Sequence, residues 1–199
     1  VGHLVAEIPE IDRAIVSTDS KEIADVAGNS GLDVPFYRPD DLSGDRISDL
    51  EVLTHALTEM EKLDETTYDI VVMLQPTSPL RRTEHVRDTI QKLIDGDWDA
   101  VWTVSETDSK NHPLKQLTVN DERLDYYDQS GKQIIARQQL VPVYHRNGVA
   151  YAIRRSCLLE QKSISGKRTG ALVLEGNLVS IDTYWDLELA EYIYKKSQG

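Results

Sequence analysis

The sequence of 199 residues has a single cysteine, one phenylalanine and two methionines, and none of its apolar runs approaches the length of a membrane span. Cys157 has no partner for an internal disulfide, so a reducing compartment such as the cytoplasm is expected. The sequence also lacks a Cys-x-x-Cys pair, a Gly-x-Ser-x-Gly elbow and the glycine motifs of Rossmann and Walker nucleotide sites. These absences argue against thiol-redox, serine-hydrolase and P-loop chemistry.

Positive charge is also scarce. Lysine and arginine together number 22 against 34 aspartate and glutamate residues, which gives a net charge of −12 and a pI near 4.8. A nucleic-acid-binding protein needs a basic face, so neither nucleic acid nor membrane is expected as a partner. A local basic pocket for one phosphate or carboxylate group is still compatible with this balance.

The most informative stretch runs from Asp69 to Arg82. The large apolar residues 70–74 predict a short strand that is buried on both faces. Pro76 and Pro79 then end the strand, because proline cannot donate a ladder hydrogen bond. The polar residues that follow therefore lie on a stiff loop at the carboxyl end of a strand, which is where ligands bind in open α/β sheets.

Strand and helix patterns alternate along the chain, which predicts a single α/β domain over residues 1–199 with a mostly parallel sheet. Strands are expected at 14–18, 70–74, 100–104 and 148–153, and within 174–182. Residues 112–146 are expected to form an antiparallel excursion from this domain.

Helices are expected between these strands, with caps that the sequence indicates. Asp19 is predicted to cap a helix whose inner side carries Ile23, Val26 and Ala27. Ser48 and Glu51 predict a capping box, and Thr83 begins the helix after the central loop. Thr183 with Asp186 is predicted to cap the last helix, with Trp185, Leu189, Ala190 and Ile193 facing inward.

Several polar residues at predicted strand ends could carry chemistry. Asp182 could hold Mg²⁺ through its carboxylate oxygens, or it could be a surface residue before a helix. Arg38, Arg81 and Arg137 each offer a two-pronged set of donors that suits a carboxylate or phosphate, although any single arginine could equally be solvated. The residues alone leave these alternatives open.

Five segments carry specific patterns over almost the whole chain: STDSKEIADVA (17–27), VPFYRPDDLSGD (34–45), LQPTSPLR (74–81), ARQQLVPVYHRNGVAYA (136–152) and SIDTYWDLELAE (180–191). Together they resemble the N-acylneuraminate cytidylyltransferase family. The resemblance implies a Rossmann-like nucleotidyltransferase fold in which the excursion serves as a small dimerisation subdomain. It also implies a homodimer and an Mg²⁺-assisted reaction of CTP with a nine-carbon keto-acid sugar, giving a CMP-sugar and pyrophosphate.

The resemblance assigns roles residue by residue. Arg38 is implied on the nucleotide side, Asp182 as the metal ligand and Arg137 at the sugar carboxylate, the last two as the catalytic pair. Arg81 is expected to support the central loop. The substrate side is implied to comprise Gln75, Thr77, Ser78, Arg81, Gln138, Asn147 and Tyr151.

Two departures from the family pattern accompany these assignments. Ser180 stands where the family has the first aspartate of a metal-binding pair. The family's glycine- and lysine-rich nucleotide loop is expected before the point where this chain starts, so we expect that segment to be absent from it. Two alternatives follow: a non-catalytic or truncated relative that binds sugar and dimerises, and a transferase for another keto sugar such as Kdo. The Kdo family's acidic residue at the position of Thr77 is not found here.

Overall fold

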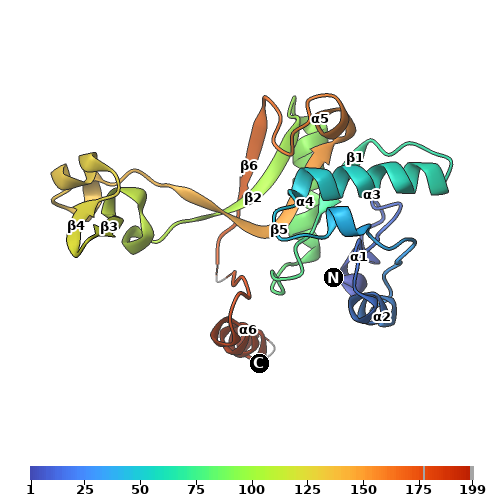
Figure 1. Cartoon of the computed structure of the whole chain (residues 1–199), viewed down its shortest axis with the longest axis horizontal. Helices are drawn as coiled ribbons and strands as arrows, with labels where there is room; N and C mark the ends of the chain where they lie inside the picture. The colour runs from blue at the N-terminus through green and yellow to red at the C-terminus, as the bar shows by residue number, and fades with distance from the viewer. Residues whose placement is uncertain (177, 198–199) are drawn as a thin grey trace.

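The computed structural model describes residues 1–176 and 178–197. The chain forms an α/β domain from which a long arm extends (Figure 1). Among the described residues, five short 3-10 helices lie in the loops: η1 (Asp40–Leu42), η2 (Ser109–Asn111), η3 (Pro113–Lys115), η4 (Gln129–Gln133) and η5 (Arg137–Gln139). The helices and strands are α1 (Gly2–Val5), α2 (Lys21–Asn29), α3 (Asp49–Leu63), β1 (Ile70–Met73), α4 (Thr83–Asp95), β2 (Ala100–Glu106), β3 (Leu117–Asn120), β4 (Arg123–Tyr126), β5 (Tyr144–Arg154), α5 (Arg155–Leu159), β6 (Thr169–Val173) and α6 (Tyr184–Ser197).

The central sheet has the strand order β1-β5-β2-β6. Strands β1, β2 and β6 run in one direction, and β5 runs against both of its neighbours. The reversal arises because the chain leaves the domain along β2 and returns from the arm beside it. The predicted α/β class with mostly parallel strands is thus confirmed, with β5 as the antiparallel member.

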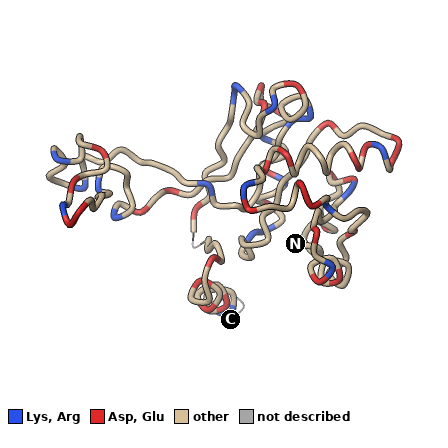
Figure 2. The backbone as a smooth tube through the Cα atoms, viewed as in Figure 1, with Lys and Arg blue, Asp and Glu red and all other residues tan. Residues whose placement is uncertain are grey.

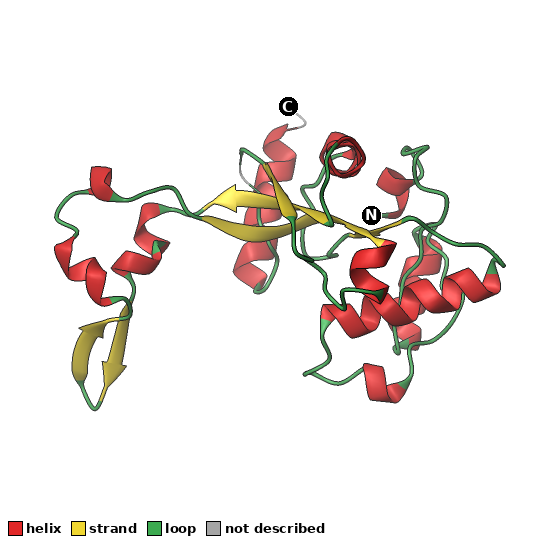
Figure 3. Ribbon diagram, turned by 90° about the horizontal axis from the view of Figure 1, so that it is seen from above, coloured by secondary structure: helices red, strands yellow, loops and turns green. Residues whose placement is uncertain are grey.

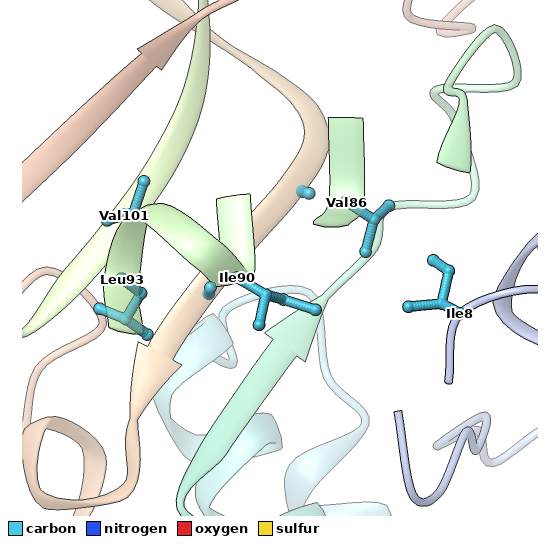
Figure 4. Packing of buried hydrophobic residues seen from close by; sticks show 7 residues of the cluster. Ile8, Val86, Ile90, Leu93 and Val101 are labelled. Carbon is cyan, nitrogen blue, oxygen red and sulfur yellow. The ribbon is translucent and has the colours of Figure 1, made fainter. Parts of the chain in front are cut away.

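Helices cover both faces of this sheet and bury an apolar core on each side. On one face, Val86, Ile90 and Leu93 of α4 pack with Val101 of β2 and with Ile8, which follows α1 (Figure 4). On the other face, α3 and α5 pack against the alternate residues of the same strands, in a cluster of Leu57, Ala100, Ile153, Cys157 and Leu158. The carboxyl end of β1 is therefore supported from two sides.

The arm comprises the residues between β2 and β5, and its tip is the antiparallel hairpin of β3 and β4 (Figures 1 and 3). The predicted antiparallel excursion is confirmed in this respect. The arm exposes large apolar side chains, among them Ile135 at 92% and Val119 at 67%. Its role in dimerisation stays a prediction at this point.

The strand predicted at 14–18 is wrong. Residues in this stretch make only two isolated parallel bridges, Ile15 with Asp33 and Thr18 with Tyr37. Pro35 lies between these partners and has no amide hydrogen, so a continuous ladder cannot form there. The segment is extended, but it does not form a regular strand.

The predicted inner side of α2 is wrong for two of its three residues. Ile23 is 53% exposed and Val26 66% exposed, whereas Ala24 and Ala27 are buried. The helix begins one residue later than expected, since Ser20 rather than Asp19 caps it by accepting from the Ile23 amide. Small alanine side chains therefore form the buried face of α2.

The C-terminal predictions need two corrections. The last strand in the described part of the chain is β6, which precedes the predicted range 174–182; residue 177 of that range lies outside the described residues. Thr183 and Asp186 do form the predicted cap of α6, through a hydrogen bond from the Asp186 amide to Thr183 Oγ1 at 3.3 Å. However, Trp185 is 72% exposed, because α6 stands apart from the sheet (Figure 1); Leu189 is also exposed.

Charged residues of both signs are distributed along the whole chain trace (Figure 2). Within residues 1–176 and 178–197, no helix is long and apolar enough to cross a membrane.

Candidate functional site

The candidate site forms around an irregularity in β5. Five residue steps of β5, from Tyr151 back to Arg146, lie opposite only two steps of β2, from Trp102 to Val104. The extra residues include Gly148, whose φ of 70° lies in the left-handed region that favours glycine. Such bulges re-aim side chains beside functional sites. Here the bulge turns main-chain carbonyls toward the loop that follows β1.

Arg81 holds the bulge and the loop together. Its Nε donates to the Val149 carbonyl at 2.8 Å, and its Nη2 donates to the carbonyls of Gly148 at 3.0 Å and Gln75 at 2.5 Å. Burial lowers the pKa of Arg81 to about 10, so the side chain stays charged at neutral pH. The role expected for Arg81, support of the loop, agrees with this geometry.

Ser78 and Tyr151 fix the same turn from two further directions. The Ser78 hydroxyl donates to the Asn147 carbonyl at 2.7 Å, and the Gly148 amide donates to the Tyr151 hydroxyl at 2.8 Å. Tyr151 is only 1% exposed, and burial raises the pKa of its hydroxyl. The hydroxyl groups of Ser78 and Tyr151 are both bonded to the main chain, and both side chains are buried, so they present little surface to a ligand.

Asn147 is anchored by β2 across the bulge. Its Oδ1 lies 2.6 Å from the hydroxyl of Thr103, and its Nδ2 donates to Ser105 Oγ at 3.1 Å. The Thr103 hydroxyl also accepts from the Ala150 amide at 3.0 Å, so it fills the gap that the bulge opens in the ladder. Thr103 itself is fully buried.

Gln75 and Thr77 are the predicted substrate residues that remain available. Both side chains are half-buried. The Gln75 side chain lies directly over Gly148, because a Cβ added at that glycine would collide with Gln75 Oε1. The Thr77 carbonyl accepts from the Ile181 amide at 2.8 Å, and this bond brings the segment before α6 to the loop.

That bond also places Asp182 beside Thr77. The Asp182 carboxylate is exposed, whereas the neighbouring Asp186 carboxylate accepts from the Asp182 and Thr183 amides as a helix cap. No group of three metal-ligating side chains occurs in the described part of the chain. A single free carboxylate still fits Mg²⁺, which keeps several waters and takes further oxygens from substrate phosphates.

Arg38 lies in a different polar cluster. Its guanidinium donates to Asp19 at 3.4 Å and to Ser43 Oγ at 3.4 Å, while its amide donates to the Thr18 carbonyl at 2.8 Å. The cluster joins the end of the 14–18 segment to the loop that contains η1. Its proximity to a nucleotide stays a prediction.

Arg137 and Gln138 lie on η5 in the arm, apart from Gln75. Arg137 lines a cavity of about 340 Å³ at the base of the arm, together with His112 and the segments 106–109 and 140–143. Hydrogen bonding to the Lys110 amide is the main reason that the pKa of Asp108 in this cavity is lowered, and the charge of Arg137 adds to the effect. Within one copy of the chain, Arg137 and Gln138 therefore lie away from the Gln75 cluster.

The residue patterns did not single out Gly148 or Thr103. Gly148 could have been found as a glycine inside a strand pattern, which signals a bulge. Thr103 carried no such signal, because its importance comes from pairing with a bulge 44 residues later in the chain.

The comparisons with known sequences agree on one family. A family model described as Cytidylyltransferase matches residues 1–197. The pseudaminic acid cytidylyltransferase of Campylobacter jejuni subsp. jejuni is 30% identical over 186 residues, covering 92% of this chain and 78% of that protein. The CMP-N,N'-diacetyllegionaminic acid synthase of Legionella pneumophila subsp. pneumophila is 29% identical over 198 residues, covering 94% and 80%. An N-acylneuraminate cytidylyltransferase of Escherichia coli O18:K1:H7 is 27% identical, covering 93% of this chain and 42% of that protein.

Solved structures support the same fold. The CMP:2-keto-3-deoxy-manno-octonic acid synthetase complexed with CTP superposes with a TM-score of 0.66 at 17% identity, covering 98% of this chain and 86% of that one. The 4-diphosphocytidyl-2C-methyl-D-erythritol synthase of Anaerococcus prevotii gives a TM-score of 0.60 at 16% identity, covering 97% and 83%. These likenesses confirm the predicted nucleotidyltransferase fold.

Proposed function

Since this chain belongs to the cytidylyltransferase family, we propose that it transfers CMP from CTP to a nonulosonic acid of the acylneuraminate type. The products are the CMP-sugar and pyrophosphate. The anomeric hydroxyl oxygen of the sugar forms the new bond to the α-phosphorus of CTP, and the bond from that phosphorus to pyrophosphate breaks. The protein's main contribution to such a reaction is to position the two substrates and to neutralise charge.

The observation that supports this proposal is the meeting of three separate segments at the end of β1. The side chains of Ser78 and Arg81 join the 75–81 loop to main-chain carbonyls of the β5 bulge. The Gln75 amide also donates to the Gly148 carbonyl, and the Ile181 amide joins the segment of Asp182 to the Thr77 carbonyl. Gln75 and Thr77 are the side chains on this frame that would contact the acceptor sugar. Arg38 would act on the nucleotide side.

We assign Mg²⁺ to Asp182, with the rest of its shell supplied by water and by CTP oxygens. The ion would neutralise charge on the triphosphate when it is bound. The main chain at Asp182 is held by two hydrogen bonds: the Ile181 amide donates to the Thr77 carbonyl, and the Asp182 amide donates to the Asp186 carboxylate at 3.1 Å. The Asp182 carboxylate therefore starts from a defined backbone position.

The proposed functional unit is a homodimer. Arg137 and Gln138 lie on the arm, so they would reach a sugar only if the arm approaches the site of a second copy. The exposed apolar side chains of the arm, which include Ile135 and Val119, suit burial in such an interface.

The decisive experiment is an assay of pyrophosphate release with CTP, Mg²⁺ and one acceptor at a time. N-acetylneuraminic, legionaminic and pseudaminic acids form the panel, and Kdo is the comparison acid. We expect pyrophosphate with at least one nonulosonic acid and none with Kdo. Asp182→Asn should abolish most of the rate, while Asp25→Asn, on the exposed surface of α2, should not.

A non-catalytic sugar-binding protein is the second candidate, because the available side chains of Gln75 and Thr77 belong to a different cluster from Arg38, the residue proposed for the nucleotide side. That candidate predicts thermal stabilisation by a sugar acid, no stabilisation by CTP and no pyrophosphate with any acceptor. Pyrophosphate release from Kdo alone would instead refute the acylneuraminate assignment.

A further inference from the structure

A row of side chains crosses the sheet just before the bulge. Met73, Tyr151 and Trp102 are paired across β1, β5 and β2, and residues paired in this way point to the same face. This is the face covered by α3, because Trp102 packs against the core cluster on that side. Arg146 pairs with Val104, the next residue of β2 on this face, and its guanidinium carbon lies 5.4 Å from the centroid of the Trp102 ring.

Trp102 holds Arg146 in a position that leaves its charge available. No carboxylate lies within ion-pair distance of Arg146 among residues 1–176 and 178–197, and its side chain is exposed. A guanidinium at this distance from an indole centroid is attracted to the ring, and its N–H groups that do not face the ring remain able to donate. The Trp102 ring is itself fixed, since its Nε1 donates to the Ile164 carbonyl at 3.1 Å.

Arg146 lies on the same face of the sheet as Met73, which is two residues before Gln75, the available substrate side chain. Arg146 also lies two residues before Gly148, whose carbonyl accepts from the Gln75 amide at 3.2 Å and whose Cα lies under the Gln75 side chain. Burial raises the pKa of the Tyr151 hydroxyl, which accepts from the Gly148 amide, and the nearby charge of Arg146 opposes this shift. The charge of Asp49 shifts the pKa of the same hydroxyl in the opposite direction and raises it.

The other candidate arginines are engaged elsewhere. Arg81 donates to three main-chain carbonyls, Arg38 pairs with Asp19, and Arg137 lies on the arm. Of these four arginines, Arg146 is the one that lies two residues from the Gly148 turn and forms no ion pair within the described part of the chain.

We propose that Arg146 binds the carboxylate of the acceptor sugar acid and that Trp102 positions it for this contact. The inference rests on the proposed function, since it names the residue that recognises the acid group of that acceptor. The two-pronged guanidinium matches a carboxylate in shape as well as in charge. A neutral ester of the same sugar would gain nothing from Arg146, and this difference makes the role testable.

The test is titration calorimetry with N-acetylneuraminic, legionaminic and pseudaminic acids, with and without CDP, followed by the methyl ester of the acid that binds most tightly. The proteins are the wild type, Arg146→Gln, Arg146→Lys and Arg137→Gln, with Arg87→Gln as the control because Arg87 is an exposed arginine of α4. We expect Arg146→Gln to weaken binding of the acid by about 10- to 100-fold, as for a lost charge-assisted pair. Arg146→Lys should restore part of the affinity, and the ester should bind the wild type and Arg146→Gln equally.

Four results would overturn the inference: unchanged acid affinity in Arg146→Gln, equal losses for acid and ester, no acid binding to the wild type, or an acid-specific loss in Arg137→Gln alone. Pyrophosphate release, measured in parallel, separates this inference from the proposed function. Turnover with an unchanged acid KM in Arg146→Gln would remove only the Arg146 role. Acid-specific binding that depends on Arg146, without pyrophosphate from the wild type, would remove only the transferase proposal.

Discussion

The Ser78 hydroxyl donates to the main-chain carbonyl of Asn147 at 2.7 Å, across 69 residues of sequence. This bond joins the loop after β1 to the bulge of β5, and both of its residues are buried. A buried polar pair of this kind costs free energy when it is broken, because the remaining partner is left without water. The geometry of the candidate site therefore depends on contacts that form only when the sheet is assembled.

Gly148→Ala should destabilise the protein and disorder the site. An added Cβ would lie 2.6 Å from Ser78 Oγ and closer still to Gln75 Oε1, and alanine disfavours the φ of 70°. The left-handed conformation alone costs about 1–3 kcal/mol, to be measured by urea unfolding. Gly28→Ala is the control, because Gly28 lies in α2 with open space around it, and should be neutral or stabilising by roughly 0.5–1 kcal/mol. Equal effects of the two substitutions would contradict this account.

Arg81→Met should be strongly destabilising although it leaves the apolar core intact. The substitution removes a charged donor from three carbonyls. The carbonyls of Gly148 and Gln75 keep one amide donor each, whereas that of Val149 loses its Arg81 partner. Loss of hydrogen bonds to a charged donor suggests about 2–3 kcal/mol in the free energy of unfolding. Arg87→Met removes an exposed pair with Glu10 and should cost less than about 1 kcal/mol. A small effect of Arg81→Met would show that the loop is held by other contacts.

Glu61 should make part of the stability depend on pH. Hydrogen bonds from Arg155 at 2.7 and 3.0 Å lower the pKa of Glu61 below its ordinary value of about 4.5. The folded state therefore binds this proton less readily than the unfolded state, so the contribution is complete above about pH 4.5 and is lost as the pH falls below it.

Thermal unfolding across this acidic range measures the effect. The melting temperature of Glu61→Gln should depend less steeply on pH below about 4.5 than that of the wild type. Glu22→Gln, an exposed residue of α2, should keep the wild-type slope. Identical slopes for all three proteins would rule out a role for the Glu61 pair.

Ile135→Asp should weaken the proposed dimer without unfolding the domain. Ile135 is 92% exposed on the arm, so an aspartate costs the monomer little but places a charge in an apolar interface. Sedimentation velocity should show a dissociation constant raised by at least about tenfold, which corresponds to about 1.4 kcal/mol. Val26→Asp on α2, where Val26 is 66% exposed, is the matched control. A wild-type protein that stays monomeric would refute the homodimer.

Patterns of residues that are neighbours in the sequence were sufficient to predict many of the helices and strands of this fold. The run 70–74 and its prolines predicted a strand and its end, and Ser48 and Glu51 predicted a capping box, and the structure contains both, because these features depend on neighbouring residues. The expected full burial of this strand is not found: β1 lies at the edge of the sheet and its four residues are half-buried. The wrong predictions concern features that depend on residues far away in the sequence. At residues 14–18, Pro35 interrupts the pairing of the expected strand. On α6, the aromatic side chains remain exposed.

By itself, the sequence determined the α/β class, the polar loop at the end of the Ile70 strand and the resemblance that named the substrate residues. Only the tertiary structure decided how those residues divide. Ser78, Arg81, Asn147 and Tyr151 build the frame, whereas Gln75, Thr77 and Asp182 remain available to a ligand. The physical reason is the bulge at Gly148: its position depends on the register of β5 against β2, and register is a property of two strands that no single segment encodes.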